Sequence, residues 1–89
     1  MKGIITVLGK DRVGIIAKVC EFLSKKNINI LDISQTIVNG YFNMMMIVDM
    51  SNATDSMEIV ADGLAEVGKE LGVVATMQHE DIFNCMHRI

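Results

Sequence analysis

Alternating hydrophobic and polar positions divide this chain into short extended segments. A run rich in β-branched residues at 3–8 and apolar-patterned runs at 28–38, 41–50 and 73–77 predict four strands. The dipeptide Asn39-Gly40 separates the second run from the third. Asn-Gly favours a type I′ turn, because both central residues of that turn need a positive φ. The second and third strands are therefore predicted to form a hairpin.

A helical spacing of apolar residues follows the first strand. The helical pattern covers residues 15–26. The helix is predicted to start at Asp11 or Arg12 and to end at Lys25-Lys26, with Asn27 as a cap. Its apolar face is formed by Ile16, Val19, Cys20 and Leu23.

A second helical stripe follows the third strand, at Val60, Leu64, Val67 and Leu71. Asp55 and Glu58 resemble a capping box at its start, and Gly72 stands where a helix-terminating glycine belongs. Gly63 and Gly68 inside the helix each cost about 1 kcal/mol relative to Ala, so we expect close packing against the sheet at both positions.

The order strand–helix–strand–strand–helix–strand indicates an α+β fold. With right-handed crossovers it gives a four-stranded antiparallel sheet with two helices on one face, the ferredoxin-like βαββαβ sandwich. A short C-terminal helical tail is expected over residues 79–89, with Ile82, Phe83, Met86 and Ile89 on one side.

Both faces of the predicted sheet carry apolar side chains. In the third strand one face receives Phe42, Met44, Met46, Val48 and Met50, and the other receives Tyr41, Asn43, Met45, Ile47 and Asp49. In the second strand Ile28 and Ile30 fall on one face, and Leu31, Ile33 and Ile37 on the other. A sheet with helices on one face only should have a polar second face, so either the tail or a second subunit is expected to cover it.

The amino-acid composition and net charge restrict the kinds of partner that this chain can bind. Of 89 residues 51% are hydrophobic, which is high for so small a domain and predicts a homodimer or a higher homo-oligomer. The net charge of −3 and the absence of a basic run argue against direct nucleic-acid binding. No apolar run reaches the length of a membrane span and no signal peptide opens the chain, so a cytoplasmic protein is expected.

Candidate metal and redox residues are scattered. Cys20 and Cys85 form no Cys-x-x-Cys pair, and no cofactor is predicted. Met44-Met45-Met46 offers thioethers for Cu(I), but strand alternation separates the three and favours core or interface packing. His79, Asp81 and His87 could ligate a metal if the tail bent. On a regular helix the two histidines lie about 12 Å apart, which favours capping or interface roles.

The loop Gly9-Lys-Asp-Arg-Val-Gly14 offers a place for a ligand. It joins the first strand directly to the first helix, and the unpaired backbone N–H groups of such a helix start attract carboxylates and phosphates. Asp11 could accept hydrogen bonds from a ligand ammonium group or cap the helix. Arg12 could pair with a ligand carboxylate or lie solvated. Gly14 could admit a ligand to the backbone or allow close packing.

Three spaced motifs resemble the ACT domain, a ferredoxin-like regulatory module that commonly binds amino acids. They are residues 9–16, then Asn29-Ile-Leu-Asp-Ile33 with Gln35, then Phe42-Asn-Met-Met-Met46, and the resemblance covers about residues 3–77. The chain is similar to the small stand-alone bacterial members, akin to one half of the glycine cleavage system repressor. It implies an ACT domain at residues 1–78 and a separate tail at 79–89.

The resemblance also implies where a ligand binds. In amino-acid-binding ACT domains the loop after the first strand comes from one subunit and the start of the second strand from its neighbour. The equivalent positions here are Asp11, Arg12, Val13 and Gly14 in the loop and Asn29, Ile30 and Leu31 in the strand. The chain is thus predicted to be a non-enzymatic regulatory module that binds a small ligand, an amino acid, at a homodimer interface and acts allosterically.

Two other functions fit the same fold. A ligand-free dimer could dock on a protein partner through the two-faced sheet or the tail. An acylphosphatase-like enzyme would cradle a phosphate with Arg12 in the first loop, but the loop spacing and the order of Val13 and Gly14 depart from that family. Nothing in the chain resembles a Ser/His/Asp or Cys/His nucleophile system.

Overall fold

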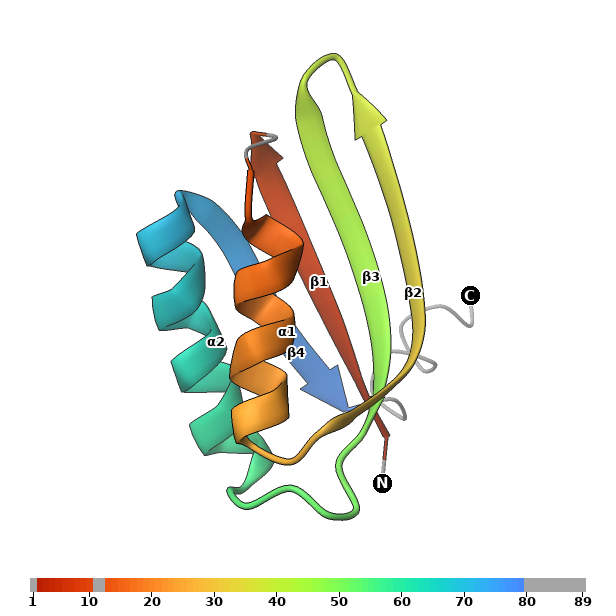
Figure 1. The fold of residues 1–89 in the computed structure, drawn as a ribbon, viewed down its shortest axis with the longest axis vertical. Coiled ribbons are helices and arrows are strands. Elements are labelled where there is room, and N and C mark those ends of the chain that lie inside the picture. The colour runs from red at the N-terminus through yellow and green to blue at the C-terminus, as the bar shows by residue number, and fades with distance from the viewer. Residues whose placement is uncertain (1, 11–12, 80–89) are drawn as a thin grey trace.

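The computed structural model describes residues 2–10 and 13–79, and it has the predicted ferredoxin-like fold (Figure 1). The strands are in the order β2-β3-β1-β4 and all neighbouring pairs are antiparallel. Residues 80–89 of the predicted helical tail lie outside the described residues, and its first residue, His79, is instead the last residue of a strand. The elements are β1 (Lys2–Lys10), α1 (Ile15–Lys25), β2 (Asn29–Val38), β3 (Tyr41–Asp49), α2 (Met57–Leu71) and β4 (Val73–His79).

The hydrophobic core lies between the sheet and the two helices. The third-strand alternation is confirmed, because Phe42, Met44, Met46 and Val48 are all buried on the side that the helices cover, which we call the helix face. They meet Ile5 and Val7 of β1 and the stripes of α1 and α2 there. Met44 and Met46 are core residues, while Met45 lies on the opposite side, the open face. No described helix is long and apolar enough to cross a membrane.

Helix α1 differs from the prediction at its start. It begins at Ile15 with Gly14 as the N-cap, in a left-handed conformation with φ 91°, so the expected start at Asp11 or Arg12 is wrong. Its end is one residue from the prediction: the helix ends at Lys25 with Lys26 as the C-cap, and Asn27 follows the cap at φ 58°. The Asn27 and Ile28 amides donate to the Ser24 and Leu23 carbonyls, which is the Schellman arrangement.

Helix α2 is also capped differently. Ser56 is its N-cap, and the Ser56 side chain accepts a hydrogen bond from the Ile59 amide, so the expected Asp55–Glu58 capping box is wrong. Asp55 instead forms an ion pair with Lys26 at 2.6 Å, which ties this loop to the end of α1. Gly72 ends the helix at φ 73°, as predicted.

Close packing explains both glycines of α2, but against different neighbours. A Cβ at Gly68 would lie 2.8 Å from the Val73 carbonyl oxygen, so the prediction of contact with the sheet is confirmed there. A Cβ at Gly63 would lie 2.7 Å from the tip of the Phe22 ring on α1. This glycine therefore allows close packing between the two helices, and the prediction that it packs against the sheet is wrong.

The β2–β3 hairpin contains a bulge that the sequence pattern does not reveal. Asn39 and Gly40 have φ of 52° and 80°, which confirms the type I′ turn. The register shifts between Ile30 and Asp32, and beyond the shift Ile33 and Ile37 pair with the helix-face residues of β3. Ile30, Ile33 and Ile37 therefore share one face, and their predicted separation onto two faces is wrong.

The open face of the sheet is partly apolar, as predicted. The described residues that expose large apolar side chains there are Leu8, Val38, Tyr41, Met45 and Val74. On β2 this face is mostly polar, because the bulge turns its isoleucines to the helix face.

Candidate ligand site at the two ends of helix α1

The predicted ligand residues lie at opposite ends of α1. Asp11 and Arg12 lie outside the described residues, and Val13 and Gly14 precede the first turn of the helix. The predicted strand residues begin β2, which follows the last turn. Eleven helical residues separate the two groups by about 16 Å. One chain therefore does not bring the two halves of the predicted site together.

The helix-start half is a shallow depression of ≈ 270 Å³. It extends from Gly14 and the first turn of α1 to Ile37, near the end of β2. A Cβ at Gly14 would meet nothing within 4 Å, so close packing of this glycine within its own chain is wrong as an explanation, while packing against a second subunit stays a prediction. Its positive φ requires glycine instead, and Gly14 provides no capping side chain for the first backbone N–H groups of α1.

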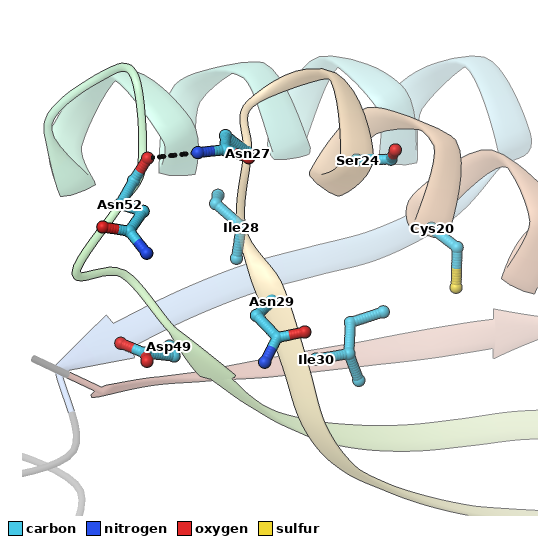
Figure 2. Close-up of a pocket in the computed structure, with 8 residues that line it drawn as sticks. All are labelled: Cys20, Ser24, Asn27, Ile28, Asn29, Ile30, Asp49 and Asn52. Atoms are coloured by element: carbon cyan, nitrogen blue, oxygen red, sulfur yellow. Dashed lines mark hydrogen bonds between the residues drawn. The ribbon is translucent and has the colours of Figure 1, made fainter.

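The strand-start half is a larger depression of ≈ 370 Å³ (Figure 2). Its lining comes from the end of α1, the start of β2, the end of β3 and the loop that follows, namely Cys20, Ser24, Asn27, Ile28, Asn29, Ile30, Asp49 and Asn52. Asn29 and Ile30 were predicted from the sequence. Leu31 belongs to the bulge and does not line the depression.

Two contacts hold the rim of this strand-start depression in place. The Asn27 side chain donates from Nδ2 to the Asn52 carbonyl at 2.8 Å, as Figure 2 shows. The Thr54 amide donates to the Lys26 carbonyl at 3.0 Å. Because Asn27 is itself fixed by the Schellman turn, the loop after β3 is held against the end of α1.

Asp49 brings a charge into the depression that sequence reasoning missed. Its Oδ1 accepts hydrogen bonds from the Ser51 hydroxyl at 2.6 Å and the Ser51 amide at 2.9 Å. The hydroxyl bond and then the amide bond lower the pKa of Asp49 below its ordinary value. Asp-x-Ser at the end of a strand is a weak sequence signal for such a turn.

Metal ligation receives no support within residues 2–10 and 13–79, where no cluster of three His, Cys, Asp or Glu side chains occurs. Cys20 lines the strand-start depression as a free thiol, and His79 ends β4. Cys85, Asp81 and His87 lie outside the described residues.

Comparison with known proteins identifies the family. The sequence pattern of the ACT domain matches residues 3–78. The chain belongs to the ACT domain family. A UPF0237 protein from Bifidobacterium longum is 56% identical over 88 residues, which cover 99% of this chain and 98% of that protein.

Solved structures agree with this assignment. An ACT domain protein from Streptococcus pneumoniae has a TM-score of 0.82 and 38% identity, with 93% of each chain covered. A glycine cleavage system transcriptional repressor has a TM-score of 0.73 and 24% identity over 89% of this chain and 47% of that protein. The predicted likeness to one half of such a repressor is confirmed for the fold.

Proposed function

We propose that this ACT domain is a non-enzymatic regulatory module that binds an amino acid at a homodimer interface. Each binding site combines the start of β2 from one protomer with the start of α1 from its partner. The supporting observation is the separation of two half-built depressions at opposite ends of α1, each holding part of the predicted ligand set.

The exposed edge of β2 provides the geometry for such a dimer. β2 is one of the two outer strands of the sheet, the other being β4, and neither helix lies over β2 in Figure 1. Its free edge offers backbone N–H and C=O groups that a second β2 can pair with across a two-fold axis. Ile33 and Ile37, which are 41% and 57% exposed, would be buried beside this seam.

Antiparallel pairing of the two β2 strands brings the half-sites together. In a two-fold pair the start of one strand lies beside the end of the other. Gly14 and the end of β2 share the helix-start depression, so the partner's first α1 turn would approach Asn29. Symmetry then creates two composite sites. The helix start suits the ligand carboxylate, and the amide side chains at the strand start suit its other polar groups.

Ligand-induced stabilisation tests this function. We expect one or more of the twenty amino acids to raise the Tm of the purified protein by several degrees, since a ligand at about 100 times its Kd adds about 2.7 kcal/mol. Gly14→Val should abolish the shift, because a branched side chain at the exposed helix start would obstruct the ligand.

The matched control is Gly40→Val. Gly40 also has a positive φ, 80°, and open space around its Cβ position, but it lies in the hairpin turn. It should lose similar stability and keep the ligand response. A folded, dimeric Gly14→Val protein that still binds normally would contradict the proposed site, and acyl phosphate turnover by the wild type would contradict the non-enzymatic assignment.

A ligand-free docking module is the second candidate, because the open face exposes Leu8 and Val74 by 55% and 64%. This alternative predicts a protein partner whose binding no metabolite alters. A blank ligand screen, with partner capture that Leu8→Lys abolishes, would favour it over amino-acid binding.

A further inference from the structure

The open face of the sheet is buried near one end and exposed near the other. On β1 the open-face residues Ile4 and Leu8 are 7% and 55% exposed, although each has a neighbouring strand on both sides. On β3 the opposing Ile47 is half-buried, whereas Tyr41 at the other end of that strand is 54% exposed. We call the part around Ile4 and Ile47 the near half of the open face, and the part around Leu8 and Tyr41 the far half.

The two helices do not account for the burial of Ile4. Both helices lie over the opposite side of the sheet (Figure 1), and Ile4 is not a member of the described core cluster. Its neighbours across the strands are Ile47 and the exposed Gln78. A sheet face with no layer over it leaves its side chains partly in water, so burial this deep indicates a further layer over the near half.

The chain leaves the sheet beside the near half. β4 ends at His79, opposite Gly3, at the edge of the sheet where β1 begins (Figure 1). Neighbouring strands lie about 5 Å apart, so Ile4 and Ile47 lie about 5 and 10 Å in from β4. Residues 80–89 extend about 15 Å even as a helix, which is enough to reach both.

The sequence of residues 80–89 suits an apolar surface. At helical spacing one side collects Ile82, Phe83, Met86 and Ile89, and the opposite side collects Glu80, Asn84 and Arg88. We propose that residues 80–89 fold back over the near half of the open face of their own chain and bury Ile4 and Ile47 beneath their apolar side. The far half stays accessible, so a protein partner on the open face would dock around Leu8. This inference does not depend on the proposed ligand site.

Methyl NMR of the full-length protein with a soluble gadolinium chelate tests the proposal. In the wild type the Ile4 methyl groups should be shielded from the chelate, and the Leu8 methyl groups should not. Phe83→Asp should release residues 80–89, because a carboxylate is costly to bury against apolar side chains, and should raise the relaxation of the Ile4 methyl groups about threefold. The Leu8 signals should not change.

Asn84→Asp is the matched control. It adds the same charge one residue further along, on the polar side, and should leave Ile4 shielded. A folded Phe83→Asp protein in which Ile4 stays shielded would overturn the proposal.

Nuclear Overhauser contacts in the wild type give a second test that does not need the variant to fold. We expect contacts between the Phe83 ring and the Ile4 methyl groups within one chain. A mixture of differently labelled chains separates contacts within a chain from contacts between chains. Contacts between chains only would place a second copy over the near half and overturn the proposal, and so would the absence of any contact.

Discussion

At the scale of single residues, local hydrogen bonds decide what Asp49 contributes. Its folded-state pKa is depressed, mainly by the Ser51 hydroxyl, so the carboxylate stabilises the fold at pH values above its ordinary pKa. That contribution is lost as the pH falls through the lower, folded-state pKa.

Ser51→Ala should therefore raise the pKa of Asp49 toward its ordinary value, because it removes the 2.6 Å hydroxyl bond and keeps the amide bond. NMR titration of the Asp49 carboxyl carbon measures the change directly. The Tm should also fall less steeply with acid below the ordinary carboxyl pKa. An Asp49 titration curve identical in wild type and variant would show that the hydroxyl does not hold the carboxylate.

Single-residue predictions from the sequence were correct where a backbone conformation is favoured by only one or two residue types. Asn39, Gly40 and Gly72 have the positive φ values expected of them. Asp49 was missed because its place in the depression depends on its pairing with Asn29 and on the turn to Ser51, neither of which has a strong pattern. The roles of Asp11 and Arg12 stay predictions.

At the scale of elements, hydrophobic periodicity was enough to find every strand and helix now described. It failed at the boundaries, where several residues compete for the same role. Ser56 caps α2 although Asp55 and Glu58 have the capping-box spacing, because Asp55 is engaged with Lys26. The sequence pattern also did not predict the bulge at residue 31, because a search for strict alternation cannot detect an inserted residue.

The two α2 glycines give an element-scale prediction. Gly68→Ala should lower the free energy of unfolding by about 1–2 kcal/mol, because its Cβ meets β4 backbone and overpacking outweighs the gain in helix propensity. Gly63→Ala is the paired comparison and should be nearly neutral, because the Phe22 ring tip can shift. Urea unfolding with a common m-value measures both, and equal losses at the two positions would contradict this packing.

At the scale of the whole molecule, the proposed dimer is supported by the unpaired edge of β2 and by the exposed isoleucines beside it. Ile33→Lys places a charge on the proposed seam and should convert the proposed dimer into a monomer of about 9.8 kDa without unfolding it. Ile59→Lys makes the same change at a 55% exposed position on α2 and should leave the dimer intact. Sedimentation velocity distinguishes the two, and a dimeric Ile33→Lys protein would place the interface elsewhere.

Complementation between two inactive variants tests the composite site most directly. Gly14→Val damages the helix-start half and Asn29→Arg the strand-start half, so neither homodimer should bind the amino acid found in the screen. In co-expressed mixtures half of the dimers are mixed, and each mixed dimer regains one intact site, so calorimetry should recover about one quarter of the wild-type binding capacity. No recovery, with mixed dimers present, would contradict a site shared between two protomers.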